Sequence, residues 1–534
     1  MTLRTRVTAL ALLLASLPAA GQSSPALQTA ARQALDSNPE LGARLHAWTA
    51  ARHEVGVARG GYLPRLDLTA SGGRDRDKVE SRTPEKSSLS RTGASLSVTQ
   101  MLWDGGDTRS EVQRLGHAGL SRYFEFTDAA QQTALEAVRA YYDVARFRRL
   151  VELAEDNYVQ HKASHDQIQA RFRAGVSRGV DLEQAAARLA LAESNLSTEI
   201  ANLHDVSARY QRIVGQLPPA SVELPQPLQQ GLPVSAASAL ETAVARSGAV
   251  SAAIENLRAV RWQLRSGEAT YQPRLEARLR SGFGHNYESV PDQRRDTSAE
   301  LLLTWNLYNG GSDHARVRQL ADLAEQAAAL RDKACRDTRQ TTTIAYNDTQ
   351  KLVDQLRFLD ANQLAIEKAR DAYRKQFDIG QRSLLDLLNS ENELYTARRA
   401  YANAEYDLGI AYARVHAAAG TLLSTLGITA QAEPPPEAQG WAAGEDQAAR
   451  CPAAGPEVLI TSKSQLDARA HRLSNAAPAL PPGVLPGTAP QTAPTAPAGP
   501  GSRDGAPVTT TPSRPAPLPA PARPGAVPPA GAPR

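Results

Sequence analysis

The chain has 534 residues, 42% of them apolar and 5% aromatic, which is lean for the three or four globular domains that such a length suggests. A formal charge of +4, from 60 basic and 56 acidic side chains, argues against a nucleic-acid partner held by its phosphates. Two cysteines, Cys335 and Cys451, cannot supply a disulfide framework or a cysteine-rich metal site, and the sequence leaves their state open.

The N-terminus has the layout of an export signal. Arg4 and Arg6 precede an apolar run from Val7 to Leu17, and small residues follow up to Gly21. That run is too short to cross a bilayer, and no later stretch reaches the roughly 20 apolar residues of a transmembrane helix. We therefore expect a signal peptide at residues 1–21. If the mature chain crosses a membrane, it must do so as β-strands.

Two blocks of the mature chain are copies of one another, at 22–217 and 235–428, with a proline-rich linker at 218–234. The copied elements include Tyr62-Leu63-Pro64 and Tyr271-Gln272-Pro273, Leu102-Trp103-Asp104-Gly105-Gly106 and Leu307-Tyr308-Asn309-Gly310-Gly311, and Phe172, Gly175 and Asp181 with Phe377, Gly380 and Asp386. A tandem repeat of about 200 residues is the strongest global signal in the sequence.

Each copy contains a strand pair followed by long helices. Period-two alternation predicts strands at about 64–72 and 93–103, and again at about 273–283 and 298–308, each with one apolar and one polar face. Tyr62, Trp103, Tyr271, and Trp305 or Tyr308 lie near the strand ends, where the aromatic belts of membrane proteins belong. Four strands cannot close a barrel, so several copies of the chain would have to contribute.

Large and small residues alternate at heptad spacing after the strands. Leu387, Leu394, Tyr401 and Leu408 recur every seven residues, with Ala397 and Ala404 between them. In the first copy the interposed positions are Ala185, Ala192, Glu199, Val206 and Ile213. This pattern is typical of closely packed coiled coils. Upstream, a proline-free stretch from Asp107 to Ala174 would form a helix on the order of 100 Å long.

The C-terminal region differs from both copies. Of the 35 prolines, 18 lie in the last 60 residues, mixed with alanine, glycine and threonine. Such a composition cannot bury much apolar surface. We expect residues 429–534 to form a disordered tail.

These motifs, each present in both copies, resemble the TolC outer-membrane efflux family, and the stretch Gln376 to Asn389 looks most like its type I secretion branch. The resemblance implies a mainly α fold with β: a homotrimer whose four strands per chain close a transmembrane β-barrel, continued by a periplasmic α-helical coiled-coil tunnel. It implies an outer membrane location and a passive conduit for secreted polypeptides, with no catalysis, cofactor or metal. Energy would come from an inner-membrane ABC or proton-driven transporter through a periplasmic adaptor. Small-molecule efflux is the alternative, and a soluble periplasmic adaptor is less favoured.

The family also implies a closed periplasmic mouth. Carried over by position, Arg382 would bind Asp181, with Phe377 in place of a frequent tyrosine and Asp386 facing the pore. Asn389 stands where a second acidic residue is found in the family. The alternatives are a solvated helix-end pair for Arg382 and Asp181, and a helix-capping role for Asp386.

Overall fold

The computed structural model describes residues 25–78, 80–81, 83, 86–222, 224–286, 292–429, 432–451 and 460–476. The expected signal peptide lies outside the described residues, as does most of the C-terminal tail. The chain divides into two units, Met1–Pro456 and Glu457–Arg534. The second is described over residues 460–476 and contains one helix, α10 (Lys463–Ala476).

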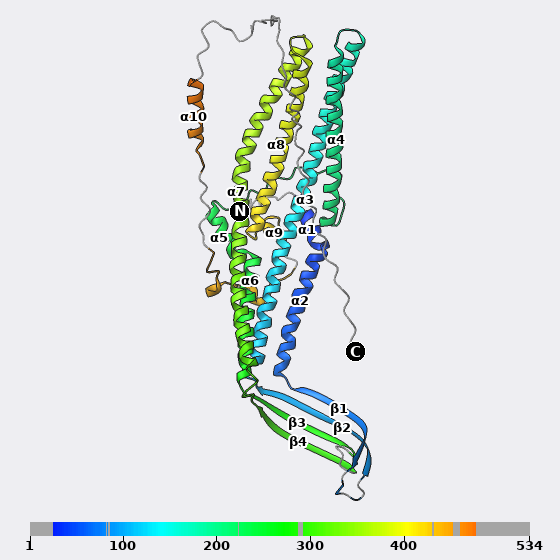
Figure 1. Ribbon diagram of the computed structural model, residues 1–534, viewed down its shortest axis with the longest axis vertical. Coiled ribbons are helices and arrows are strands. Elements are labelled where there is room, and N and C mark those ends of the chain that lie inside the picture. The colour runs from blue at the N-terminus through cyan, green and yellow to red at the C-terminus, as the bar shows by residue number, and fades with distance from the viewer. Residues whose placement is uncertain are drawn as a thin grey trace, which may run out of the picture. The chain divides into compact units, whose positions relative to one another are not determined.

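The first unit contains the same series of elements twice (Figure 1). The first series is α1 (Pro25–Ser37), α2 (Pro39–Arg59), the 3-10 helix η1 (Gly60–Tyr62), β1 (Arg65–Lys78), β2 (Lys86–Trp103), α3 (Asp107–Arg173) and α4 (Gly179–Val214). The second is α5 (Ala236–Arg246), α6 (Gly248–Glu268), η2 (Ala269–Tyr271), β3 (Arg274–His285), β4 (Gln293–Thr304), α7 (Ser312–Asp378) and α8 (Leu384–Ala418). The short elements α9 (Leu422–Thr425), η4 (Pro436–Ala438) and η5 (Gly444–Asp446) follow.

The strand bounds differ from the expected ones in both hairpins: β4 begins at Gln293 rather than near residue 298, and the first hairpin and the end of β4 differ as well. β1 continues to Lys78 and β2 begins at Lys86, because the polar and glycine-containing segment that resembled a loop keeps the antiparallel register. Arg74 lies opposite Ser90 and donates a hydrogen bond to the hydroxyl of Ser88, the residue opposite Arg76. β4 ends at Thr304 rather than near residue 308. Trp305 and Tyr308 therefore lie in the connection to α7.

The turns from strand to long helix depend on paired glycines. Gly105 and Gly106 have φ angles of +70° and +86°, which favour glycine. A Cβ on Gly105 would also lie 2.5 Å from Cβ of Gln272. The carboxylate of Asp104 accepts hydrogen bonds from the backbone N–H groups of Gly106 and Thr108, so it satisfies free donors at the start of α3.

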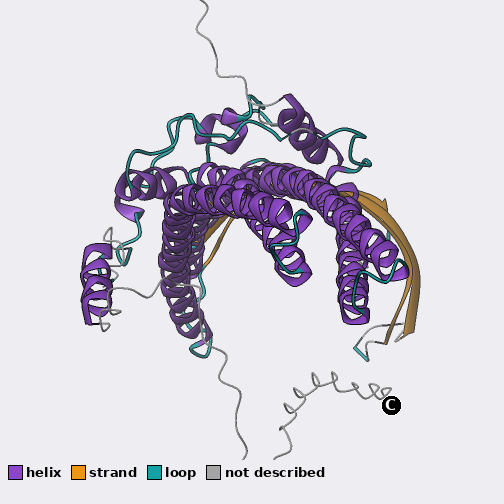
Figure 2. Cartoon of the chain, turned by 90° about the horizontal axis from the view of Figure 1, so that it is seen from above, coloured by secondary structure: helices purple, strands orange, loops and turns teal. Residues whose placement is uncertain are grey.

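Helices α3 and α7 have 67 residues each, which at 1.5 Å per residue gives about 100 Å. Each folds back through a tight turn into the shorter α4 or α8, and each pair is in extensive contact. Seen from above, the long helices follow an arc (Figure 2). The mainly helical fold with a strand–helix duplication confirms the expectation from the heptads. None of the helices in the described part of the chain is long and apolar enough to cross a membrane.

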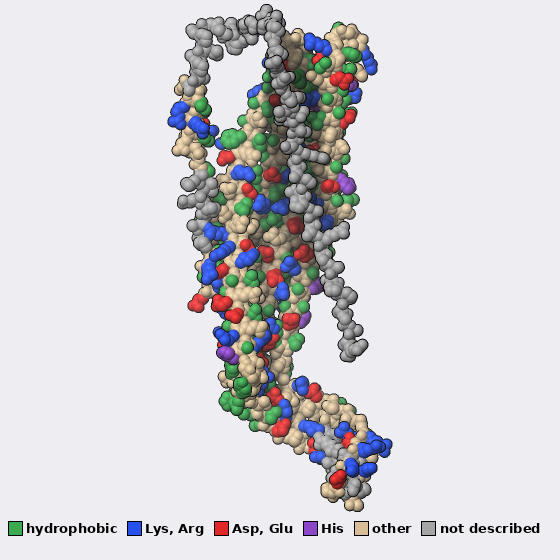
Figure 3. Space-filling model, viewed as in Figure 1, with side chains coloured by type: hydrophobic (Ala, Val, Ile, Leu, Met, Phe, Trp, Pro, Cys, Tyr) green, Lys and Arg blue, Asp and Glu red, His purple; other side chains and the backbone are tan. Residues whose placement is uncertain are grey.

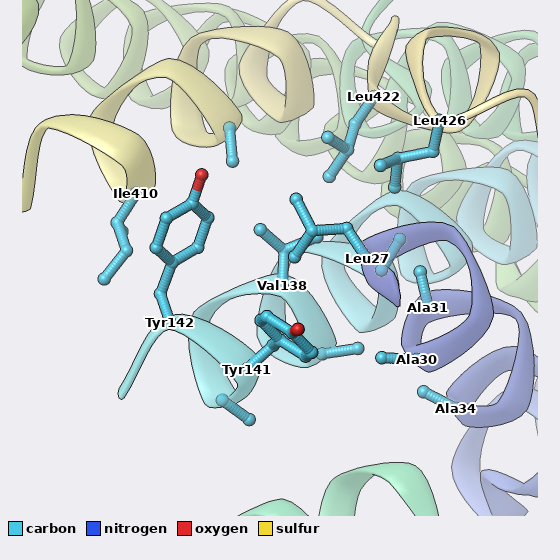
Figure 4. Packing of buried hydrophobic residues seen from close by; sticks show 14 of the residues in the cluster. Leu27, Ala30, Ala31, Ala34, Val138, Tyr141, Tyr142, Ile410, Leu422 and Leu426 are labelled. Atoms are coloured by element: carbon cyan, nitrogen blue, oxygen red, sulfur yellow. The ribbon is translucent and has the colours of Figure 1, made fainter. Parts of the chain in front are cut away.

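The main core joins the two repeats around α3 and α8. Tyr142 of α3 and Ile410 of α8 face each other in Figure 4, beside Leu27 of α1 and Leu422 of α9. The proline-rich linker also contributes, since the buried Leu228 packs in this cluster and its carbonyl contacts Nε2 of His416 at 3.1 Å. The linker is therefore attached to the helical core.

The four strands form one antiparallel sheet in the order β1-β2-β3-β4. The register aligns Leu66, Val98, Leu279 and Ala299 in one row, and Asp67, Ser97, Arg280 and Ser298 in the next row, which faces the other way. The apolar face remains open: Leu68 is 75% exposed and Leu301 is 70% exposed. β1 and β4 are the edge strands, each paired on one side within the described residues.

The C-terminal region departs from the expectation of a disordered tail beginning at residue 429. Residues 432–451 pack against α6 and α7, and Cys451 forms a disulfide with Cys335 of α7. Few apolar side chains are needed, because the disulfide and a set of arginine hydrogen bonds hold this segment. Residues 452–459 and 477–534 lie outside the described residues.

Candidate gate at the helix tips

The two helical hairpins turn by the same local chemistry. α3 and α7 end before Gly175 and Gly380, whose φ angles are +74° and +78°. The next backbone N–H groups reach back to the carbonyls of Arg171 and Gln376, at 3.0 and 2.8 Å, which closes each helix end. This shared turn places the duplicated aspartates at the same point of the following helix.

Asp181 and Asp386 both lie in the first turn of the returning helix. The Ser383 hydroxyl accepts a hydrogen bond from the backbone N–H of Asp386 at 3.2 Å and contacts its carboxylate at 2.9 Å. The carboxylate of Asp181 accepts from the backbone N–H of Arg178 at 3.4 Å. The N-cap residue of α8 is therefore Ser383, with Asp386 at the third position of the helix, while the carboxylate of Asp181 reaches back to the N-cap backbone of α4.

Within the single chain, Arg382 contacts its own hairpin and not Asp181. Its guanidinium lies 3.6 Å from the carboxylate of Asp386 and donates to Oε1 of Gln376 at 3.0 Å. It also lies 4.6 Å from the ring centre of Tyr373. Arg382 lies in the turn between α7 and α8 and contacts residues of these two helices. Asp181 lies in α4, which belongs to the hairpin formed by α3 and α4.

Phe377 forms an apolar contact between the two hairpins. It is 8% exposed and packs with Ile168 of α3, Ala185 of α4 and three leucines of α8. The guanidinium of Arg171, from α3, lies 5.2 Å from its ring centre. A ring without a hydroxyl suits this site, because the neighbours that contact it are apolar or cationic.

Asn389 joins α8 to α4. Its side-chain oxygen accepts a hydrogen bond from Arg188 at 2.8 Å. The sequence analysis missed Arg188, because the corresponding position of the second copy is Glu393 and the duplication offers no signal there. The charge of Arg188 also acts on the buried His161 of α3. Burial and this charge lower the pKa of His161, so its imidazole is neutral at pH 7.

Further polar contacts between the repeats lie between the tips and the sheet. Arg374 of α7 donates to Gln160 of α3 at 2.6 Å and lies 3.3 Å from the buried carboxylate of Glu391. Arg399 of α8 lies 2.5 Å from Glu199 of α4. The hairpins are thus joined by a series of polar contacts in addition to the apolar one at Phe377.

The expected membrane-interface aromatics lie at the helix-side end of the sheet. All five are between 46% and 84% exposed: Tyr62, Trp103, Tyr271, Trp305 and Tyr308. The indole N–H of Trp305 donates to the backbone carbonyl of Tyr271 at 3.1 Å, so these two residues of the second repeat are in contact. Hydrophobic side chains also gather at the junction of helices and strands on the face shown in Figure 3.

Comparison with known proteins gives a consistent picture. The model of one family, outer membrane efflux protein, matches residues 30–216 and 239–421. Outer membrane efflux protein BepC of Brucella suis is 25% identical over 427 residues, covering 79% of this chain and 92% of that protein. Alkaline protease secretion protein AprF of Pseudomonas aeruginosa is 26% identical over 406 residues, covering 73% and 83%. Outer membrane protein TolC of Escherichia coli is 24% identical over 413 residues, covering 73% and 81%.

Solved structures share the fold. That of the outer-membrane channel OprN superposes with a TM-score of 0.68 at 22% identity, and the match covers 74% of this chain and 90% of that one. Both repeats, from the first helices to α8, thus have counterparts in known proteins.

Proposed function

The chain belongs to the outer membrane efflux protein family, and from this membership we propose that three copies form a passive channel from the periplasm across the outer membrane. The membership confirms the family resemblance of the sequence and the outer membrane location. It also removes support for a soluble periplasmic adaptor. The relatives are channels rather than enzymes.

The exposed sheet carries this proposal. Its apolar face suits lipid and its polar face suits water, as in the wall of a membrane barrel. Its two edge strands would leave backbone groups unpaired in hydrocarbon, which costs several kcal/mol per group. Pairing β1 of one copy with β4 of the next removes both edges, and three copies of four strands would close a barrel of twelve.

A stripe along α7 supports the trimer. Leu323, Leu330, Ile344 and Phe358 are spaced by multiples of seven and are 36–55% exposed. Apolar residues at heptad spacing favour cover by another helix. The arc of the helices in Figure 2 suits one segment of a tunnel wall completed by two further copies.

The channel is tested by fractionation and by conductance. We expect the protein in the outer membrane fraction, a trimer in mild detergent that dissociates in SDS, and discrete conductance steps in planar bilayers. Phe358→Glu should weaken the trimer, because it places a charge in the α7 stripe, whereas Lys368→Ser, at another exposed side chain of α7, should not. Recovery of the wild-type chain as a water-soluble monomer would contradict the proposal.

We propose secreted polypeptides as cargo, in a type I system with a periplasmic adaptor and an inner-membrane ABC transporter. The likeness to AprF and the tip sequence from Gln376 to Asn389 support this choice. The likeness to BepC favours the second candidate, small-molecule efflux with a proton-driven or ABC pump. Deletion of the gene separates them: loss of a polypeptide from the culture medium supports the first, and increased drug sensitivity without that loss supports the second.

We propose that the hairpin tips close the periplasmic mouth, with Arg382, Asp181, Asp386, Asn389 and Phe377 near the constriction. Within one chain Arg382 is held by Asp386, so a contact with Asp181 would have to come from a neighbouring copy or another state. The Arg382–Asp386 pair is about 40% exposed on both sides, and such pairs contribute at most ~1 kcal/mol. A docking partner could break contacts of that strength.

Arg382→Ser, alone or with Asp181→Ala, should raise the single-channel conductance. Loss of a pair worth up to ~1 kcal/mol shifts the balance of closed and open states by up to about fivefold. Arg122→Ser is the control on α3, since its partner Glu125 lies in the same helix and that pair is also partly exposed, at 56% and 36%. Equal conductance in the wild type, the control and both variants would remove Arg382 from the gate and leave the fold untouched.

A further inference from the structure

Residues 432–451, here called the strap, lie beyond the matched family segment, which ends at residue 421. The strap carries η4 and η5 and lies beside α6 (Figure 1). Its last residue, Cys451, is bonded to Cys335 of α7, 116 positions earlier in the sequence. The strap is thus held at both ends, by the chain that follows α9 and by a disulfide.

Trp441 of the strap completes a buried polar cluster. Its indole N–H donates to Oε1 of Glu255 at 2.7 Å, and its ring centre lies 5.0 Å from that of Phe124 in α3. Glu255, on α6, is fully buried, and its other oxygen contacts Nδ1 of His117 in α3 at 2.7 Å. Burial alone would raise the pKa of the Glu255 carboxyl, but the hydrogen bonds from His117 and Trp441 outweigh it and hold that pKa below its usual range.

Arginines of α6 and α7 converge on the strap around Asp446. Arg258 donates to its carboxylate at 2.7 Å and to the carbonyl of Ala443 at 2.8 Å, and Arg261 binds the other carboxylate oxygen. Arg331 of α7 donates to the backbone carbonyl of Asp446 at 3.0 Å. The strap therefore joins α6 to α7 and, through Trp441 and Glu255, to α3 of the first repeat.

The covalent anchor differs from the other contacts in how it can be released. Cys335 is 1% exposed, whereas Cys451 is half-buried, so a reductant reaches the bond from the strap side. Of the two arginines that bind the Asp446 carboxylate, Arg261 is 51% exposed and its pair is weak, whereas the Arg258 pair is mostly buried. A disulfide across a long loop is the stronger restraint.

We propose that the strap is a redox-controlled clamp: the Cys335–Cys451 disulfide locks α6 and α7 against α3, and its reduction frees the strap while the channel fold persists. A dithiol supplies the two electrons. Its thiolate attacks Sγ of Cys451, and Cys335 leaves as a thiolate and takes a proton. The second thiol then displaces Cys451, which leaves as a thiolate and is protonated, and the reductant becomes a disulfide. A protein disulfide oxidant of the export compartment would run the reverse reaction. The proposal does not depend on the trimer or the cargo.

Amide hydrogen exchange on the full chain in detergent tests the clamp. After reduction with dithiothreitol, we expect amides of residues 438–451 to exchange on the order of 100-fold faster, the factor that a typical disulfide contribution implies. Amides of α3 around Tyr142 and of the hairpin tips should be unchanged. The double variant Cys335→Ser/Cys451→Ser should show the fast rate without reductant and no response to it.

Asp446→Asn, which keeps both cysteines, separates the covalent anchor from the ion pairs. When oxidised, this variant should stay close to the wild-type rate, and when reduced it should exchange faster than the reduced wild type. Strap amides that remain protected after complete reduction of the wild type would overturn the proposal. Faster exchange throughout the helices would overturn it as well, because the disulfide would then hold the whole fold rather than the strap.

Discussion

Replacement of Arg399 by alanine is expected to lower the free energy of unfolding by about 3–5 kcal/mol. The guanidinium of Arg399 lies 2.5 Å from the carboxylate of Glu199, a residue that is 1% exposed. The side-chain amide of Asn202 also donates a hydrogen bond to this carboxylate, at 3.3 Å. Without the guanidinium, a carboxylate remains buried between α4 and α8 with one weak donor. That uncompensated charge is the source of the cost, rather than the strength of the ion pair itself.

Two further variants distinguish a buried charge from a general loss of arginine. Arg149→Ala removes a guanidinium whose pair with Glu152 is more than half exposed on both sides, so it should cost at most ~1 kcal/mol. The double variant Glu199→Leu/Arg399→Leu should recover most of the lost stability, because no charge is left buried. Denaturant unfolding followed by circular dichroism, at one fixed protein concentration, measures all three. A loss at Arg399 no larger than that at Arg149 would contradict the argument.

Glu199 also shows what the sequence pattern could and could not predict. Heptad spacing identified its position among Ala185, Ala192, Val206 and Ile213, and each of these is buried in the structure. Period-two alternation likewise identified the faces of the strands. The partner of Glu199 could not be found in this way, because Arg399 is 200 positions away and only the docking of the two repeats brings them together.

The contacts at the tips and in the strap could not be predicted either, because they too join residues that only the folded chain brings together. The duplication indicated Asp386 and the family resemblance suggested Arg382, but which carboxylate Arg382 contacts depends on the path of a single turn. The prolines and alanines after residue 429 resembled those of the last 60 residues, while Trp441 and Cys451 were isolated signals without a periodic pattern. A long-range disulfide needs only two residues, so composition gives no indication of it.

Gly409→Val is the second substitution with a large expected effect, near the upper end of the ~1–3 kcal/mol that overpacking typically costs. Gly409 of α8 lies directly against Tyr142 of α3, in the core that joins the repeats. A Cβ there would lie 2.4 Å from Cε1 and 2.6 Å from Cζ of that ring. Tyr142 is 1% exposed, so its ring cannot move aside into solvent.

The neighbouring ring provides the means to test that cause. If the clash is with Tyr142, then Tyr142→Leu should be less harmful in the Gly409→Val background than in the wild type, giving a measurable coupling free energy. Gly56→Ala is the control in α2, where a Cβ meets nothing within 4 Å, and it should gain up to about 1 kcal/mol because alanine favours a helix over glycine. Additive effects of the two core substitutions would mean that the close approach of α3 and α8 is not what requires glycine. A coupling would instead show that the close approach of α3 and α8 at this pair requires glycine, on the sheet side of the polar contacts that lead to the tips.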